Sequence, residues 1–376
     1  MTEINDLATV EGVRAYISGT PFDSGDVSRL SGGLGNFTYR LSLRTPYNGH
    51  TTVILKHGKP YVPGMEDMAF SLERQVYEVT ALRQIRATLP PDPPVSVPEV
   101  LRFDENAHVI IMSDCGAHGL SLKQALIAGA LPPAAARRVG HALGGFLARF
   151  HARGKEDSGA TVFFGRNEEG KRLSALVTYG RLVSTLTGGA PPVLADPPLE
   201  VSQGELARIA EVAGETERAM LETTETVVMG DFWPGNVLVS LAEAGDASGG
   251  VAVESVSVID WEMAKTGLAG LDIGQFVAEL HVICEFKPDG REAASNVIDA
   301  FLRAYREGAG AGANLGVARR ALTHVGAHLV AWTPVVGWEG REKVREVVKQ
   351  GVDLLVEGSE GTEEYMKGSI LGPLLG

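Results

Sequence analysis

The chain has 376 residues, of which 44% are hydrophobic and 22% charged, as in a globular protein long enough for two packed lobes. A net charge of −13 argues against binding to nucleic acid, and the apolar runs are too short for the roughly 20 residues of a membrane span. The two cysteines, Cys115 and Cys284, are too few for a disulfide framework and are not spaced like metal ligands. The N-terminus is polar, unlike a secretory signal, so we expect a cytoplasmic protein.

The first third of the chain has the pattern of a small β-rich lobe. Residues 27–43 contain strand-like segments around a glycine turn, and Thr51–Lys56 is a short apolar strand that ends in a lysine. Helical spacing of apolar residues predicts a helix over Ala69–Leu89, and His108–Met112 is a further strand. We therefore expect an N-terminal lobe over residues 1–112 and a polar hinge at 113–119.

Residues 120–376 have the pattern of a larger, helical lobe. A long helix is predicted over Ala134–Arg153, where Gly144-Gly145 allows close packing, and Leu238–Ser257 is predicted to be a hairpin with a polar tip. The Gly/Glu-rich tail from Glu357 is expected to be loosely held. The predicted fold class is α+β, with a small β-rich N-lobe and a large helical C-lobe.

Two acidic segments carry the strongest chemical pattern. An apolar strand delivers Asp231, Asn236 follows five residues later, and a second strand ends in Asp260 and Glu262. Phosphoryl transfer needs a group that orients the acceptor hydroxyl and takes its proton, with oxygen ligands for magnesium close by. Asp231 is the candidate base, and Asn236, Asp260 and Glu262 are the candidate metal ligands. The alternatives are an ordinary Asp/Asn turn between strands and, for Glu262, a surface acid.

A glycine turn and a lysine precede these segments. The turn lets backbone N–H groups approach phosphates, although most glycine turns are only hairpins, and it lacks the P-loop pattern. Lys56 stands where a kinase-type lysine reaches phosphates, and it needs a glutamate partner on the next helix. Glu73 and Glu78 are both candidates, and since they point about 140° apart only one can face Lys56; we prefer Glu73. The residues of the turn are Gly32, Gly33, Gly35 and Asn36.

These segments resemble motifs of one family. Met229-Gly-Asp231-Phe-Trp-Pro-Gly-Asn236 resembles the H-G-D-x-x-x-x-N loop of the aminoglycoside phosphotransferase and choline kinase superfamily, with Met229 in place of the histidine. Ile259-Asp260-Trp-Glu262 resembles its metal motif, and Gly270-Leu-Asp272 resembles the helix start whose aspartate usually braces the catalytic loop. The resemblance implies a two-lobed protein-kinase-like fold that uses ATP and Mg²⁺. It also implies adenine contacts from the backbone of Met112, Ser113 and Asp114.

Two narrower resemblances concern the acceptor. Asp260-x-Glu262 is similar to a pattern of 5-methylthioribose kinases, and segments such as Leu143–His151 and Ala327–Trp332 resemble the 4-hydroxytryptamine kinases of the mushroom psilocybin pathway. The second resemblance runs from about Leu30 to about Leu355. It implies a monomeric small-molecule O-kinase of secondary metabolism whose acceptor is a hydroxytryptamine-type aromatic amine, with methylthioribose or another sugar-like alcohol as runner-up.

Further residues and protein classes remain open. Tryptophans are candidates for stacking on an aromatic or cationic acceptor, and two arginines resemble a pair near the substrate of methylthioribose kinases, although core packing and a solvated helix face are the alternatives. A nucleotide-binding pseudokinase, which would serve as an interaction module, is the alternative to an active small-molecule kinase. A protein kinase is disfavoured because the H-R-D, D-F-G and A-P-E segments are missing. The acceptor-side candidates are Trp233, Trp332, Trp338, Arg319 and Arg320.

Overall fold

The computed structural model describes residues 6–376 except 32, 34, 117–118, 189–190 and 244–250. Its contacts divide the chain into two compact units. The N-terminal unit comprises Met1–Gly119 and Ser257–Glu262, and the C-terminal unit comprises Leu120–Val256 and Met263–Gly376. The short return of residues 257–262 to the N-terminal unit was not predicted. Residues 117–118 of the expected hinge, and 244–250 of the expected hairpin tip, lie outside the described residues.

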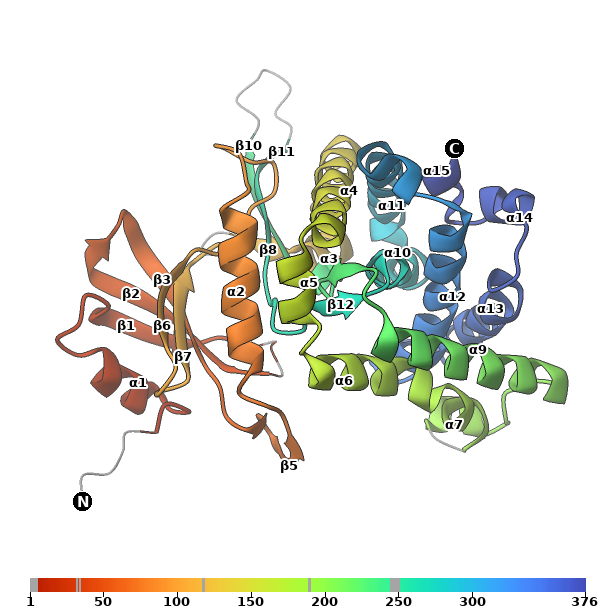
Figure 1. The fold of residues 1–376 in the computed structure, drawn as a ribbon, viewed down its shortest axis with the longest axis horizontal. Helices are drawn as coiled ribbons and strands as arrows, with labels where there is room; N and C mark the ends of the chain where they lie inside the picture. The colour runs from red at the N-terminus through yellow and green to blue at the C-terminus, as the bar shows by residue number, and fades with distance from the viewer. Residues whose placement is uncertain (1–5, 32, 34, 117–118, 189–190, 244–250) are drawn as a thin grey trace. The chain divides into compact units, whose positions relative to one another are not determined.

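The N-terminal unit is built on a five-stranded antiparallel sheet with the order β1-β2-β3-β7-β6. Its core fills one face of the sheet, where alternate residues such as Tyr39, Leu41 and Leu55 pack against the first helix. Lys56 follows Leu55 and therefore points to the other face, which is covered by the second helix (Figure 1). The strands are β1 Ser24–Arg29, β2 Phe37–Tyr47, β3 His50–His57, β6 Val100–Asp104 and β7 Val109–Ser113, with a ribbon of β4 Tyr61–Val62 and β5 Met65–Ala69, and the helices are α1 Val10–Ile17 and α2 Arg74–Arg86.

Helix α2 is shorter than predicted. The apolar spacing predicted a helix from Ala69, but Ala69 ends strand β5 and the helix begins at Arg74. The turn between β2 and β3 agrees with its sequence, because Asn48 and Gly49 have positive φ angles of 48° and 85°, as an Asn-Gly hairpin requires.

The C-terminal unit is mainly helical, as predicted. Helix α4 packs closely on α11, because a Cβ atom at Gly144 would lie 2.1 Å from the carbonyl oxygen of Phe301. The larger helices are α4 Pro133–Glu156, α6 Glu168–Thr178, α9 Gln203–Glu222, α10 Ala269–Phe286, α11 Pro288–Ala309, α12 Leu315–Trp332 and α13 Arg341–Gly358. The shorter ones are α3 Leu122–Ile127, α5 Ser158–Phe164, α7 Leu182–Thr187, α8 Pro192–Ala195, α14 Glu363–Gly368 and α15 Gly372–Leu375.

Short strands carry the chemical segments of this unit. They are β8 Leu120–Ser121, β9 Thr226–Val228, β10 Val237–Glu243, β11 Val251–Val258 and β12 Lys265–Gly267. Strands β10 and β11 are hydrogen-bonded neighbours, as the predicted hairpin requires, and β9 pairs with β12. In the described part of the chain no helix is both long and apolar enough to cross a membrane.

The prediction of a loosely held C-terminal tail is wrong. Residues after Glu357 form α14 and α15, and Met366, Leu371 and Leu374 are fully buried. The Gly/Glu-rich composition hid these anchors because α14 has six residues and α15 only four, which is too short for a helical periodicity to be seen.

Candidate active site

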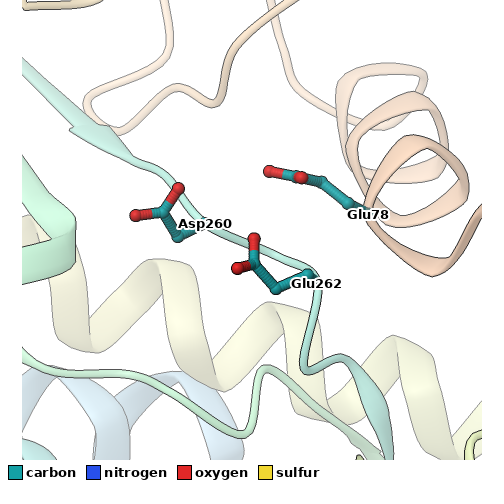
Figure 2. A group of neighbouring side chains, drawn as sticks. All are labelled: Glu78, Asp260 and Glu262. Atoms are coloured by element: carbon teal, nitrogen blue, oxygen red, sulfur yellow. The ribbon is translucent and has the colours of Figure 1, made fainter. Parts of the chain in front are cut away.

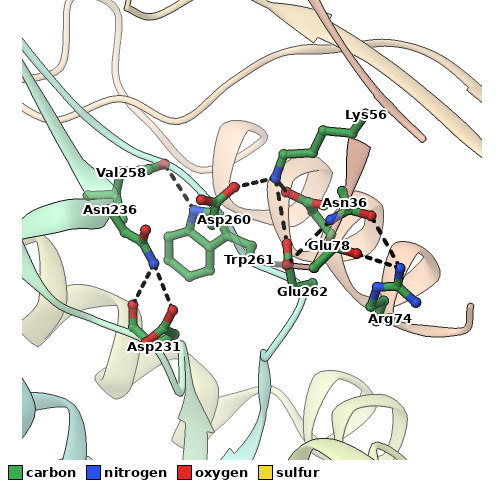
Figure 3. A network of polar contacts seen from close by, with 11 residues as sticks. Asn36, Lys56, Arg74, Glu78, Asp231, Asn236, Val258, Asp260, Trp261 and Glu262 are labelled. Atoms are coloured by element: carbon green, nitrogen blue, oxygen red, sulfur yellow. Dashed lines mark hydrogen bonds and ion pairs between the residues drawn. The ribbon is translucent and has the colours of Figure 1, made fainter. Parts of the chain in front are cut away.

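In the N-terminal unit, Lys56 is the centre of a charged cluster. Its Nζ atom lies 2.5 Å from Glu78 Oε1 and 3.6 Å from Glu262 Oε2, and it also bonds to Asp260 Oδ1 (Figure 3). The Lys56 side chain is only 7% exposed, so these contacts are shielded from water. Residues about 200 positions apart in the chain therefore meet around one ammonium group.

The preference for Glu73 over Glu78 is corrected by this geometry. Glu73 is exposed at the start of α2, whereas Glu78 is completely buried and bonds to Lys56. Glu78 shares its helix face with Leu82 and Ile85, which lie four and seven residues later and are also buried. The expectation failed because it counted Val76 toward the buried face, and Val76 is 37% exposed.

The charges of this cluster do not balance. Burial alone would lower the pKa of Lys56, but the carboxylates of Asp260 and Glu78 outweigh it and hold that pKa well above its usual range. Burial raises the pKa of Glu262 to about 8; Lys56 opposes this shift, and the neighbouring carboxylates add to it. Glu78 and Asp260 alone outnumber the one lysine, and ionisation of Glu262 would add a further negative charge that a cation could neutralise.

The oxygen atoms in this cluster fit a magnesium ion. One carboxylate oxygen each from Glu78, Asp260 and Glu262 lies within 4.8 Å of the other two (Figure 2). Among the described residues, Glu78 Oε2 and Glu262 Oε2 are buried and have no hydrogen-bond partner. Carboxylate oxygens are the ligands that Mg²⁺ prefers. Asp260 and Glu262 were predicted to bind metal, whereas Glu78 was not.

The end of the glycine turn is attached to the same cluster. Gly35 lies so close to Glu262 that a Cβ atom there would be 2.5 Å from Oε1, and its carbonyl accepts a hydrogen bond of 2.7 Å from Arg74. Asn36 is buried and donates to Glu262 Oε1 over 3.4 Å. Gly33 lies in the same turn, and Gly32 lies outside the described residues. The role of the turn in phosphate binding stays a prediction.

The predicted adenine-contacting segment is the end of β7. Met112 is buried between its strand partners, and the Ser113 N–H donates to the Glu99 carbonyl over 2.9 Å. The Asp114 carboxylate accepts from Arg40 at 2.7 Å. Because the Ser113 amide is already paired, an adenine contact would have to come from the other backbone groups of this segment.

In the C-terminal unit, Asp231 and Asn236 lie together on one loop. Asn236 Nδ2 donates to Asp231 Oδ2 over 2.9 Å and to the Asp231 carbonyl over 3.1 Å (Figure 3). Gln275, from helix α10, donates to Asp231 Oδ1 over 2.8 Å. Phe232 is fully buried beside Phe276, with ring centroids 4.9 Å apart. The carboxylate is thus held by two amides, and the next residue fixes the loop to the core.

A buried aspartate supports the start of this loop. Asp272 accepts hydrogen bonds from the backbone N–H groups of Met229, at 2.8 Å, and Gly230, at 2.9 Å, and from His151 at 3.0 Å. Burial alone would raise the pKa of Asp272, but these donors outweigh it and lower that pKa. The loop is held through backbone N–H groups, so the side chain at 229 is free to be an apolar methionine, which is fully buried.

The predicted acceptor-side residues divide into two groups. Trp233 and Trp338 both lie near the ammonium of Lys123, and Trp338 and Trp332 both pack against the same apolar core. Arg319 donates to the Gly361 carbonyl, and Arg320 forms an ion pair with Glu225. The arginine pair therefore makes structural contacts within the C-terminal unit.

Comparison with known proteins decides the family. Residues 26–315 match the model of the phosphotransferase enzyme family. The chain belongs to this family. This phosphotransferase is 32% identical to a 4-hydroxytryptamine kinase of Psilocybe cubensis, with 92% of each chain covered, and 30% identical to one of Psilocybe cyanescens, with 97% of each covered.

A solved structure shows that the fold extends beyond close relatives. A choline/ethanolamine kinase family protein from Mesorhizobium loti matches 97% of the phosphotransferase, with a TM-score of 0.50 and 18% identity, and 98% of that chain is covered. The predicted family, the protein-kinase-like fold and small-molecule kinase activity are confirmed.

Two residues that hold the candidate catalytic loop of the phosphotransferase had no predicted role. Gln275 holds the carboxylate of Asp231, and His151 holds that of Asp272. His151 lies in a segment that entered only through family resemblance, and no local pattern marks Gln275. The roles predicted for Asp231, Asn236, Asp260 and Lys56 remain predictions.

Proposed function

We propose that this phosphotransferase transfers the γ-phosphate of ATP to the hydroxyl group of a hydroxytryptamine-type aromatic amine. The observation that carries the proposal is the similarity to two 4-hydroxytryptamine kinases over more than nine-tenths of the chain. A likeness of this extent includes the residues on both sides of the reaction, rather than only the nucleotide motifs.

Asp231 is the base in the proposed reaction. Its carboxylate is held by Gln275 and Asn236, and it orients the acceptor hydroxyl and takes its proton. The hydroxyl oxygen forms a bond to the γ-phosphorus while the bond to the bridging oxygen breaks, and ADP leaves. Most of the rate enhancement then comes from positioning and charge neutralisation.

Lys56 and its carboxylates are the proposed nucleotide side of the reaction. The lysine binds phosphate oxygens while Glu78 keeps it in place, and Asp260 and Glu262 would hold magnesium. Asn236 is the third proposed ligand, as the resemblance of its loop to the family motif implies. When bound, the metal supplies charge neutralisation at the phosphates. The turn ending at Asn36 covers the phosphates in this arrangement, and adenine binds at residues 112–114. Residues 113–119 serve as the hinge.

The proposal is tested by measuring acceptor-dependent ADP release with 4-hydroxytryptamine, methylthioribose and choline. We expect turnover with 4-hydroxytryptamine; turnover with methylthioribose alone would favour the sugar kinase alternative. No turnover with any acceptor, together with nucleotide binding, would favour a pseudokinase.

The assigned base has its own test. Asp231→Asn should lower kcat by about 10²–10⁴-fold, as expected for loss of a positioned base. Asp299→Asn is the matched control, because Asp299 is a half-exposed surface residue paired with Arg303. A D231N variant that keeps the rate of the D299N variant would show that another group takes the proton.

A further inference from the structure

One face of helix α10 links the candidate base to a second carboxylate. From Ala269 to Leu280 the helix is buried except at Gln275 and Glu279. These two residues are four apart and therefore lie on the same face, with Cβ atoms about 5–6 Å from each other. Gln275 donates to Asp231, so Glu279 lies one helical turn beyond the residue that holds the base.

Glu279 is a buried anion. Its side chain is 12% exposed, Oε1 accepts from His328 over 2.9 Å, and Oε2 accepts from Lys123 over 3.0 Å. Burial alone would raise the pKa of Glu279, but His328 and Lys123 outweigh it and lower that pKa to about 2. The carboxylate is therefore ionised at neutral pH.

Aromatic rings surround the ammonium that this carboxylate binds. Lys123 Nζ lies 4.9 Å from the ring centroid of Trp233 and 5.5 Å from that of Trp338. Trp338 in turn stacks on Phe286, with centroids 5.0 Å apart. An ammonium between a carboxylate and indole faces has the contacts by which proteins bind alkylammonium ligands.

We propose that Glu279, Trp233 and Trp338 form an ammonium cage that binds the amino group of the acceptor, and that Lys123 holds this place until the acceptor displaces it. Lys123 is suited to this exchange because its side chain is flexible and 22% exposed. The inference rests on the proposed function, and it names the residue that makes an amine the preferred acceptor.

Gln275 and Glu279 place the two proposed contacts about one helical turn apart along α10. The hydroxyl binds at Asp231, which Gln275 holds, and the ammonium binds one turn later at Glu279. In 4-hydroxytryptamine the hydroxyl group and the aminoethyl chain are attached at neighbouring positions of the indole ring, so the hydroxyl and the ammonium can bind about one helical turn apart. A sugar-like alcohol has no ammonium to displace Lys123, so it would gain no contact with Glu279 and would bind less tightly.

The first test compares two acceptors, 4-hydroxytryptamine and 4-hydroxyindole, which lacks the aminoethyl chain. We expect Glu279→Gln to lower the ratio of their kcat/KM values by about 10–100-fold, in line with the loss of a charged hydrogen bond. Glu285→Gln is the matched control, because Glu285 lies on the same helix and pairs with Lys343. An unchanged ratio in E279Q would overturn the proposal.

The second test measures binding without phosphoryl transfer. By calorimetry, wild-type protein should bind tryptamine more tightly than indole, and E279Q should remove that difference. Lys123→Met should bind tryptamine at least as tightly as wild type, because the competing ammonium is gone. No difference between tryptamine and indole in wild type, or a loss of tryptamine binding in K123M, would overturn the proposal.

The two proposals fail in different ways. Glu279-dependent binding of tryptamine without turnover of any hydroxytryptamine would refute the proposed function and leave the cage in place. Turnover of 4-hydroxytryptamine with an unchanged acceptor ratio in E279Q would support the function and refute the cage.

Discussion

Two adjacent glycines in helix α4 should respond to the same substitution with opposite signs. A Cβ atom at Gly144 would lie 2.1 Å from the Phe301 carbonyl oxygen and 2.9 Å from the Tyr305 amide nitrogen. Both atoms belong to the backbone of α11, so they cannot move away without the helix. At Gly145, a Cβ atom would meet only the guanidinium of Arg149, at 3.3 Å, which is the end of an exposed, flexible side chain.

The magnitudes follow from this difference. An ordinary contact begins near 3.4 Å, so α4 and α11 would have to separate by more than 1 Å to accept Gly144→Ala. Overpacking of this kind typically costs about 1–3 kcal/mol, and rigid backbone neighbours place it at the upper end even after the gain in helix propensity. Gly145→Ala has only the propensity gain, up to about 1 kcal/mol.

The assay is urea unfolding followed by far-UV circular dichroism, with both variants and wild type measured together. We expect G144A to lower the free energy of unfolding by about 2–3 kcal/mol and G145A to raise it slightly. Equal effects of the two substitutions, or a neutral G144A, would mean that the close approach of α4 and α11 does not determine stability.

Three further substitutions test the charged and buried groups. Glu78→Gln should weaken ATP binding by removing the buried partner of Lys56, whereas Glu73→Gln should not, as titration calorimetry would show; equal losses would contradict the pairing. Asp272→Asn should lower the free energy of unfolding by about 3–5 kcal/mol, because an amide cannot accept hydrogen bonds from all three donors. Urea unfolding would measure this loss, and an unchanged free energy of unfolding would contradict the role of Asp272. Burial lowers the pKa of His324 from 6.5 to about 3. Between these two pH values, the unfolded chain therefore binds a proton at this histidine that the folded chain does not. His324 should therefore lower the free energy of unfolding by about 2 kcal/mol as the pH falls from 7 to 5. His324→Gln should remove this contribution, and an identical pH dependence of unfolding in the variant and the wild type would refute the reasoning.

The sequence was most informative where the interacting residues are close in the chain. Asp231 and Asn236 lie five residues apart on one loop, and the structure joins them by a hydrogen bond. The Asn-Gly turn and the close packing at Gly144 were likewise visible, because each depends on the backbone of one or two residues.

Long-range pairs escaped prediction for a physical reason. His151 and Asp272 are 121 residues apart, and their hydrogen bond leaves no periodic pattern. The partner of Lys56 depended on the helix register, where an exposed valine at 76 misled the choice of face. Glu279 had the same difficulty, since its partners Lys123 and His328 come from two other segments of the chain.

The six residues from Ser257 to Glu262 have a consequence for any attempt to divide the protein. A fragment ending at residue 119 would include Lys56 and Glu78 but neither Asp260 nor Glu262, so its lysine would retain one of three carboxylates. Exchange of the N-terminal region between homologues would carry the same defect unless the hexapeptide were exchanged with it. A crossover at the expected hinge would therefore separate Lys56 from a segment more than a hundred residues downstream.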